Sequence, residues 1–285
     1  MTQPTHNNTN TDLAWRRLYL RLEQEDLIPA PASAISPRPR RLRLAEWSVA
    51  AGAACCAGII ALALLTNNES APPPLLSLHN EKEGVTLVTT LEDGSIVYLA
   101  AGAHLRYPER FAPGKREVSL SGNALFDVQG NRRRPFLIQT EAAQVEVTGT
   151  IFHLQSAGAR SFQLSVKEGE VEVTSRRPQR LHAAAGQTIL LTSSGDLRVE
   201  PAATDNIFNP YDGQLRFKDE KLADILRIIN SQGAGAVLQT TASLSNRKIT
   251  VTFADATPEK VAELICVAFD LLCKKENNTL LITEP

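Results

Sequence analysis

The sequence predicts a membrane-anchored, multi-domain chain. Its parts are a single transmembrane helix, an all-β domain of solenoid- or sandwich-like form, and a small α+β domain at the C-terminal end. Residues 47–65 form an apolar run without a charged side chain. Residues 81–200 contain short alternating runs typical of strands, and residues 211–285 alternate between strand and helix patterns. A chain of 285 residues has room for about two folded domains.

The composition argues against several classes of protein. The chain has 30 Lys and Arg against 31 Asp and Glu, a formal net charge of -1, whereas proteins that hold nucleic acid usually carry a basic excess. Aromatic residues make up 5%, which leaves few rings for stacking bases. Four cysteines are too few for a disulfide scaffold. We therefore expect no direct contact with nucleic acid.

The apolar run from Trp47 to Leu65 reads WSVAAGAACCAGIIALALL. As a helix, about 19 residues span roughly 28 Å, close to the ~30 Å hydrocarbon core of a bilayer. A buried core helix usually keeps one polar face, and a signal peptide has a short segment before its apolar run. The sequence therefore favours an uncleaved transmembrane helix over residues 45–66, followed by a linker over residues 67–80.

Basic residues flank only one end of this run, since the next Lys or Arg after it is Lys82. Trp47 fits an anchor at the membrane interface. The positive-inside rule predicts a single-pass protein of the inner (cytoplasmic) membrane with a cytoplasmic N-terminus and most of the chain outside. The flanking arginines are Arg38, Arg40, Arg41 and Arg43.

A short amphipathic helix is predicted within residues 12–28, in the cytoplasmic segment 1–44. Its apolar side chains recur at intervals of three and four residues, so they share one helical face. Isolated helices of this length are marginal in water, so the face should dock on the membrane surface, another copy or a soluble partner. A partner-binding helix is favoured over one lying on lipid. The face consists of Trp15, Leu18, Tyr19 and Leu22.

Residues 81–200 are predicted to be all-β. Alternation is clear at Val145 and Val147 and again at Val171 and Val173, and turn signals such as Asp93–Gly94 recur between the runs. Short strands at such spacings are typical of a sandwich or of a solenoid of rungs, and the solenoid-like form is favoured.

Residues 211–285 predict the order strand–helix–strand–strand–helix–strand–strand. The first helix, within residues 221–232, ends before Gly233, and the second begins at Pro258, a residue common at the first helical position. The apolar face of the first helix consists of Leu222, Ile225, Leu226 and Ile229.

No catalytic constellation is present in the sequence, so we expect no enzyme, cofactor or metal site. The five histidines are scattered without the spacing of metal ligands, and the sequence has no phosphate-binding loop or nucleophile elbow. Cys266 and Cys273 would lie about 10.5 Å apart on one helix, too far for a disulfide, but they can approach if the helix ends at Asp270. Two buried thiols are favoured over a disulfide.

Six motifs within residues 91–173 resemble the periplasmic sensor domain of the FecR family. In order they read LEDGSIVYL, LRYPERF, REVSLSGNALFDV, PFLIQT, VEVTGTIFHL and VKEGEVEV. Residues 215–283 resemble the domain that follows FecR in Bacteroidetes-type proteins and are similar to the secretin/TonB short N-terminal domain. The N-terminal run AWRRLYLRLEQEDLIP resembles the start of those proteins.

The resemblance implies a transmembrane anti-sigma factor. The helix around Trp15 would bind a cytoplasmic sigma factor of the extracytoplasmic-function (ECF) class. The C-terminal domain would meet the periplasmic signalling domain of a TonB-dependent outer-membrane transducer, SusC-like or siderophore-linked, by strand addition at a sheet edge. Candidate contacts on the predicted strands are Leu215, Phe217, Ile249, Val251 and Phe253.

The resemblance leaves two mechanisms of signalling and one other function class to weigh. Since a single span transmits a small shape change poorly, cleavage by periplasmic and intramembrane proteases is the favoured way to release the sigma factor. The alternative function is a membrane-anchored scaffold or assembly module of the cell envelope, without a sigma partner.

Overall fold

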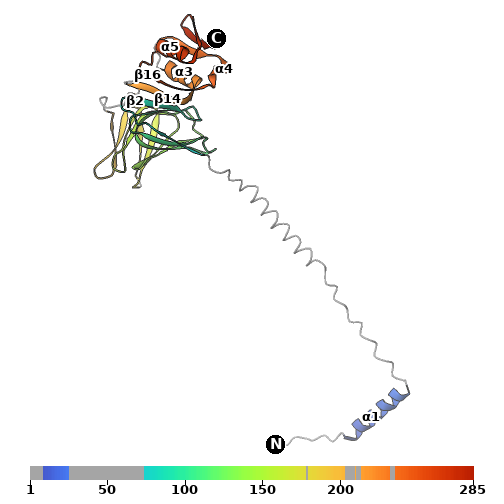
Figure 1. Ribbon diagram of the computed structural model, residues 1–285. Helices are drawn as coiled ribbons and strands as arrows, with labels where there is room; N and C mark the ends of the chain where they lie inside the picture. Colours follow the sequence, from blue (N-terminus) through green and yellow to red (C-terminus); the bar gives the residue numbers. More distant parts are fainter. Residues whose placement is uncertain (1–8, 26–73, 178, 203–208, 210–212, 232–234) are drawn as a thin grey trace. The chain divides into compact units, whose positions relative to one another are not determined.

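The computed structural model describes residues 9–25, 74–177, 179–202, 209, 213–231 and 235–285. The chain divides into two compact units, residues 1–69 and 70–285. The described part of the first unit is the helix α1 (Thr9–Gln24), which falls where the sequence predicts a helix (Figure 1). The second unit holds all the described strands.

The N-terminal part of the second unit, here called the β-body, contains only strands among its described elements. Its strands are β1 (Leu75–His79), β2 (Val85–Thr90), β3 (Ile96–Leu99), β4 (His104–Pro108), β5 (Arg116–Asp127), β6 (Phe136–Gln139), β7 (Ala143–Val147), β8 (Ile151–Ser156), β9 (Gln163–Glu168), β10 (Glu170–Ser175), β11 (Arg180–Ala184), β12 (Gln187–Leu191) and β13 (Leu197–Pro201).

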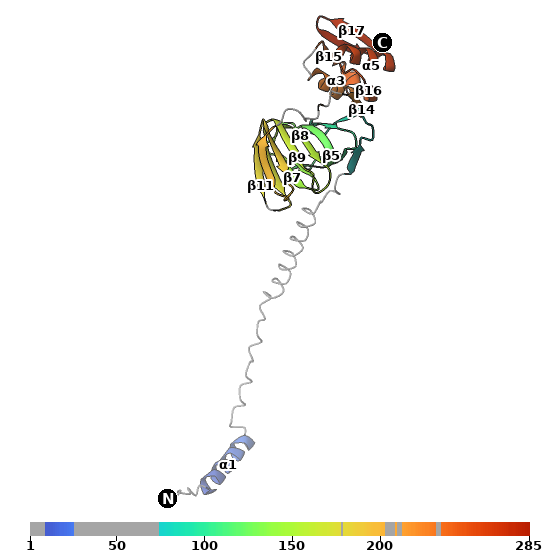
Figure 2. The ribbon, with the colours of Figure 1, turned by 90° about the vertical axis from the view of Figure 1, so that its left-hand side faces the viewer.

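The long strand β5 connects the two halves of the β-body. Its first residues pair with β6 and β4, and its last residues pair with β3 and β8. Gly122 lies where the partners change and has φ +106°, a conformation that side chains with a Cβ rarely adopt. A Cβ on Gly122 would also lie 2.7 Å from the Cα of Ala103. Glycine therefore lets β5 bend from one half of the sheet into the other (Figure 2).

The core of the β-body lies between these halves. Phe126 on β5 stacks on Phe152 of β8, with ring centroids 5.3 Å apart, and meets Phe136 of β6 edge-on at 6.3 Å. All three rings are fully buried. Strands from both halves therefore share one apolar core.

The rest of the second unit, here called the C-terminal segment, alternates between strands and helices. Its elements are β14 (Gln214–Lys221), α3 (Leu222–Asn230), β15 (Val237–Thr240), α4 (Ala242–Ser245), β16 (Lys248–Phe253), α5 (Pro258–Phe269), β17 (Leu272–Glu276) and β18 (Thr279–Thr283). The order is the one expected from the sequence, with the short helix α4 added. The four predicted core residues of the first helix are all buried.

The C-terminal segment shares its core with the β-body. Strands β2 and β3 are buried on both faces: Leu87 and Val97 face the core of the β-body, whereas Val88 and Tyr98 pack in a second core with α3, α5 and β16. The strand β14 pairs with β2 on one side and β16 on the other, while β15, β18 and β17 form a separate three-stranded sheet.

The predicted fold class is wrong. No helix among the described residues is long and apolar enough to cross a membrane. The predicted transmembrane helix, residues 45–66, itself lies outside the described residues. The strands form neither a stack of rungs nor two separate sheets, because β5 belongs to both halves of a bent, nearly closed sheet. That 15-stranded sheet also includes β14 and β16.

Candidate functional site

The junction between β2 and β14 joins the β-body to the C-terminal segment. The two strands are parallel and pair Gln214 with Val85 through Phe217 with Val88. The N–H of Gln214 donates to the carbonyl oxygen of Gly84 at 3.1 Å, where the pairing begins. A Cβ at Gly213 would lie 2.5 Å from that same carbonyl oxygen, so this approach requires glycine. The junction thus consists of continuous sheet rather than a contact between surfaces.

A β-bulge in β14 turns an acidic residue into this junction. Phe217 pairs with Val251 and Glu220 pairs with Ile249, so two residues of β14 face one of β16. Asp219 within the bulge has φ 56°, and its N–H donates to the hydroxyl of Thr250 at 3.0 Å. Lys218 and Asp219 within the bulge are exposed, whereas Glu220, which follows it, is buried.

Glu220 binds across the junction with both side-chain and backbone partners on β2. One carboxylate oxygen accepts a hydrogen bond from the Thr89 hydroxyl at 2.7 Å and another from the Thr90 N–H at 3.2 Å. The Glu220 side chain is buried, and this burial raises its pKa, while the bonds from Thr89 and Thr90 oppose that rise. Tyr107 on β4 also bonds to Thr89, and burial raises the pKa of its hydroxyl.

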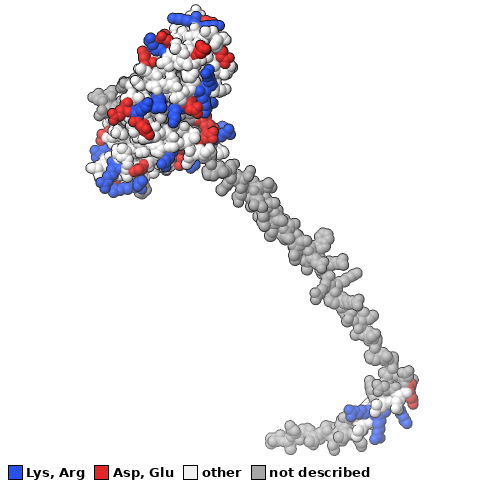
Figure 3. Space-filling view, viewed as in Figure 1, with Lys and Arg blue, Asp and Glu red and all other residues white. Residues whose placement is uncertain are grey.

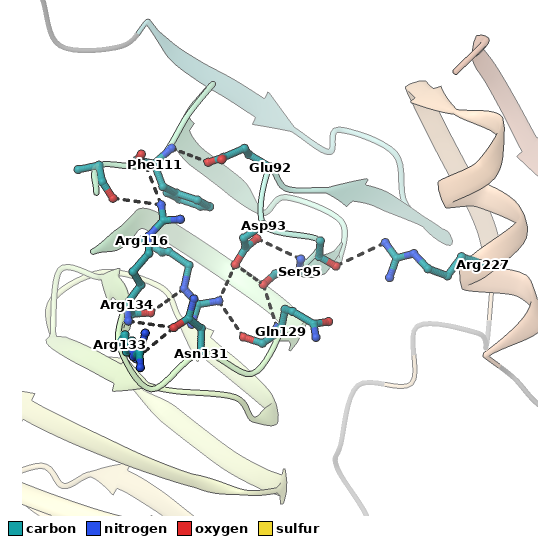
Figure 4. A network of polar contacts seen from close by, with 12 residues as sticks. Glu92, Asp93, Ser95, Phe111, Arg116, Gln129, Asn131, Arg133, Arg134 and Arg227 are labelled. Carbon is teal, nitrogen blue, oxygen red and sulfur yellow. Dashed lines mark hydrogen bonds and ion pairs between the residues drawn. The ribbon is translucent and has the colours of Figure 1, made fainter. Parts of the chain in front are cut away.

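A second polar network lies at the turn that follows β2 (Figure 4). Arg116, only 1% exposed, forms an ion pair with Asp93 at 2.6 Å and donates to the carbonyl oxygens of Gln129 and Arg134 at 2.8 Å. Asp93 in turn accepts bonds from the N–H and the hydroxyl of Ser95, at 3.0 and 2.7 Å. The ion pair therefore fixes the turn between β2 and β3 against β5.

This turn also contacts the C-terminal segment. The Arg227 side chain on α3 donates to the carbonyl oxygen of Gly94 at 3.4 Å, as Figure 4 shows beside Ser95, and pairs with Asp224 at 3.3 Å. One short turn thus connects the buried ion pair of the β-body with a helix of the C-terminal segment. The β2–β14 pairing and this contact together hold the two parts in a defined arrangement.

The junction is made of paired backbone strands, apolar contacts and buried hydrogen bonds. Within the described residues there is no group of three His, Cys, Asp or Glu that could hold a metal. The visible face of the second unit carries interspersed Lys, Arg, Asp and Glu side chains (Figure 3), as expected from the balanced composition.

The predicted partner-binding residues on α1 are exposed or half-buried where the structure describes their side chains. Trp15 is 62% exposed and Leu18 47%, and Leu22 is half-buried. Tyr19 lies within the same helix. The sequence prediction that they bind a sigma factor stays a prediction. The residues Arg38, Arg40, Arg41, Arg43 and Trp47 lie outside the described residues.

The five predicted transducer contacts lie together in the core of the C-terminal segment. Their side chains are buried: Leu215 and Phe217 of β14, with Ile249, Val251 and Phe253 of β16. Both edges of β14 are paired, whereas only β14 pairs with β16 among the described strands. A partner strand could therefore reach the backbone of β16, not these side chains, and the transducer assignment stays a prediction.

Sequence reasoning missed the residues of the junction. In the sequence, Glu220 is one of several charged residues in the run KDEK, and no local pattern predicts the bulge that precedes it. Asp93 lies in the motif LEDGSIVYL, and Arg116 is the first residue of the motif REVSLSGNALFDV. The sequence does not show that these two residues, which are far apart in the chain, form an ion pair. The signal that was available is the run of buried-type residues in β2 and β3, which is typical of strands covered on both faces.

The cysteines of the C-terminal segment lie close together. The helix α5 ends at Phe269, before both residues could lie on it, and the neighbouring Cys273 contributes to the raised pKa of the Cys266 thiol. Both are free; Cys266 is buried and Cys273 is exposed, so the expectation of two buried thiols holds for one of them.

Comparisons with known proteins bear on the β-body. Residues 81–172 match the FecR protein family. The resemblance expected from the six motifs is therefore confirmed over this FecR segment, which runs from before β2 into β10 and contains the Asp93–Arg116 pair. A search of curated proteins returns no match.

Two solved structures are similar to the chain beyond the FecR segment. Both are crystal structures of a candidate anti-sigma factor from Parabacteroides distasonis. One is 21% identical, covers 74% of this chain and 100% of its own, and has a TM-score of 0.46. The other is 20% identical, covers 74% and 99%, and has a TM-score of 0.44.

Proposed function

We propose that this protein is an anti-sigma factor whose N-terminal helix binds a cytoplasmic ECF sigma factor. The observation that carries the proposal is the exposed apolar face of α1, with Trp15 62% and Leu18 47% exposed. An amphipathic helix that exposes large apolar side chains gains free energy when a partner groove covers them. The match of residues 81–172 to the FecR family supports a regulatory role for the rest of the chain.

In this proposal the second unit is the sensor and acts by binding, not by catalysis. The C-terminal segment would receive the periplasmic signalling domain of a TonB-dependent outer-membrane transducer. The open edge of β16 favours contact by strand addition, in which backbone groups of the incoming strand pair with β16. The junction at β2 and β14 would then carry the effect of binding into the FecR segment.

The proposed location is the inner membrane, with residues 1–44 in the cytoplasm and residues 70–285 in the periplasm. Release of the sigma factor would follow cleavage by periplasmic and intramembrane proteases. The continuous sheet and the buried hydrogen bonds at the junction support proteolytic release, because a tightly packed domain responds to a ligand with only a small shape change. A single membrane-spanning helix transmits such a small change poorly. An epitope tag at each end tests the location: protease added to intact spheroplasts should remove only the C-terminal tag.

Co-purification of the full chain with the sigma factors of its own cell tests the main proposal. The variant Trp15→Ala/Leu18→Ala should lose the sigma factor and raise expression from its promoters. Leu13→Ala/Leu20→Ala is the matched control, because Leu13 and Leu20 are 54% and 61% exposed and lie about 150° around the helix from Trp15.

Two results would contradict the proposal. Recovery of no sigma factor with the native chain would favour the envelope scaffold as the function. Equal loss with both pairs of substitutions would show that α1 matters only as a helix and that its Trp15 face is not the binding surface.

A further inference from the structure

Cys266 and Cys273 lie at the reversal between α5 and β17, away from both the junction and α1. The helix ends at Phe269, and Asp270 takes a left-handed conformation with φ 54°. The N–H of Leu271 donates to the carbonyl oxygen of Cys266 at 2.9 Å, which closes the turn. The chain then returns along the end of the helix as β17, so Cys273 follows closely on the turn that is bonded to Cys266, on a strand that contacts α5.

The two thiols have different surroundings. Cys266 is 9% exposed, and burial together with the adjacent Cys273 raises the pKa of its thiol to about 11. Cys273 is exposed on an edge strand. Since the thiolate is the reactive form and a reagent must reach it, Cys273 is the residue that reacts first with an outside disulfide. Cys266 is then positioned beside the sulfur that has been modified.

We propose that Cys266 and Cys273 form a redox-active pair that closes to an intramolecular disulfide by exchange with a disulfide of a protein or a small molecule. The Cys273 thiolate attacks one sulfur of that disulfide, forms a mixed disulfide and expels the first thiolate. Cys266 gives its proton to the expelled thiolate and attacks the Cys273 sulfur, which releases the second thiol. Two cysteine thiols are oxidised, and one outside disulfide is reduced to two thiols.

Closure of this pair would fix an edge strand to a helix. All five residues of β17 are exposed, and within the described strands β17 pairs only with β18. A bond from Cys273 to the last turn of α5 would hold β17 in place even when its pairing with β18 opens. The redox state of the pair therefore sets how firmly this edge of the C-terminal segment is held. The pair forms independently of the proposed function, and the test uses purified protein.

The experiment uses the full chain carrying Cys55→Ser and Cys56→Ser, so that Cys266 and Cys273 are the remaining thiols. The protein is equilibrated with reduced and oxidised glutathione in varied ratio, and intact mass and peptide mapping are measured. We expect loss of two hydrogen atoms, a peptide cross-link between Cys266 and Cys273, and a melting temperature about 5 °C higher, reversed by excess reductant. With Cys266→Ser added, glutathione should stay attached to Cys273.

Three outcomes would overturn the proposal. The first is that the native pair stays reduced at a glutathione ratio at which Cys273 of the Cys266→Ser variant reacts fully. The second is a stable glutathione adduct on the native pair, which would show that Cys266 cannot reach it. The third is a dimer linked through Cys273 in place of the intramolecular bond.

Discussion

Glu220 of β14 and Thr89 of β2 are 131 positions apart in the chain, yet they form a buried hydrogen bond of 2.7 Å. The bond joins the FecR segment to the C-terminal segment at the place where their strands run side by side. It follows directly after the bulge at Asp219, where the register of β14 against β16 shifts by one residue and the burial of its side chains changes from exposed to buried. Substitution or protonation of the Glu220 carboxyl group should therefore change the stability of the junction.

Glu220→Ala should lower the free energy of unfolding by about 2 kcal/mol, because it leaves the Thr89 hydroxyl and Thr90 N–H buried without their acceptor. Glu220→Gln should cost less, since its amide oxygen can accept both bonds. Urea unfolding followed by circular dichroism measures both. Glu263→Ala, at an exposed position on α5, is the control and should change little. Equal losses for Ala and Gln would show that the charge, not the hydrogen bonding, matters.

The pKa of Glu220 gives the junction a pH dependence of known sign. Because burial raises this pKa, the folded state holds its proton more tightly than the unfolded chain does. Its protonated form therefore favours folding, and that contribution is lost as the pH rises through the raised folded value. The stability difference between the native chain and Glu220→Gln should shift in favour of Gln as the pH rises above about 4.3. A constant difference from pH 4 to pH 8 would contradict this assignment.

Arg116→Leu should destabilise the protein by about 3–5 kcal/mol, since it leaves Asp93 buried without its cation and removes two bonds to carbonyl oxygens. Its neighbour Lys115 provides the matched control: the exposed pair of Lys115 with Glu117 should contribute less than about 1 kcal/mol. Thermal unfolding of Arg116→Leu and Lys115→Ala compares the two. Similar losses for both variants would mean that the network around Asp93 adds little.

His153 should make the β-body sensitive to acid. It is buried on β8 beside Asn123, and burial lowers its pKa to about 4, below its ordinary value of 6.5. The unfolded chain therefore binds a proton between these values when the folded chain does not, and stability falls as the pH drops through this window, by up to about 3 kcal/mol. Melting temperatures at pH 7.5 and pH 4.5 measure the loss. His153→Gln should show a smaller loss, and an unchanged loss would assign the acid sensitivity to other groups.

Gly122→Ala should destabilise the protein by at least about 3 kcal/mol, because the new Cβ meets the backbone of Ala103 as well as an unfavourable φ. Gly102→Ala separates the two effects: Gly102 has φ +75° but nothing within 4 Å of a built Cβ, so its variant should cost about 1–2 kcal/mol. Urea denaturation compares the variants. Equal costs would show that the bend in β5 tolerates a side chain.

The elements that the sequence predicts well are those set by local patterns. The apolar faces of α3 and α5, the Pro258 start of α5 and the alternation around Val145 and Val173 depend on neighbours within a few positions, and the structure contains each of them. The six motifs likewise place the FecR segment, because they are short runs whose order is visible in the chain.

Only the tertiary structure decided how these elements join. The bend of β5 at Gly122, the parallel pairing of β2 with β14 and the bulge that buries Glu220 depend on partners far away in the chain. The hydrophobic pattern of a strand shows which of its faces is buried but not which part of the chain packs on that face. The apolar pattern of β2 and β3 therefore could not show that the C-terminal segment packs on one of their faces. The sequence determined the parts and their order, whereas long-range pairing determined that the FecR segment and the C-terminal segment share one sheet.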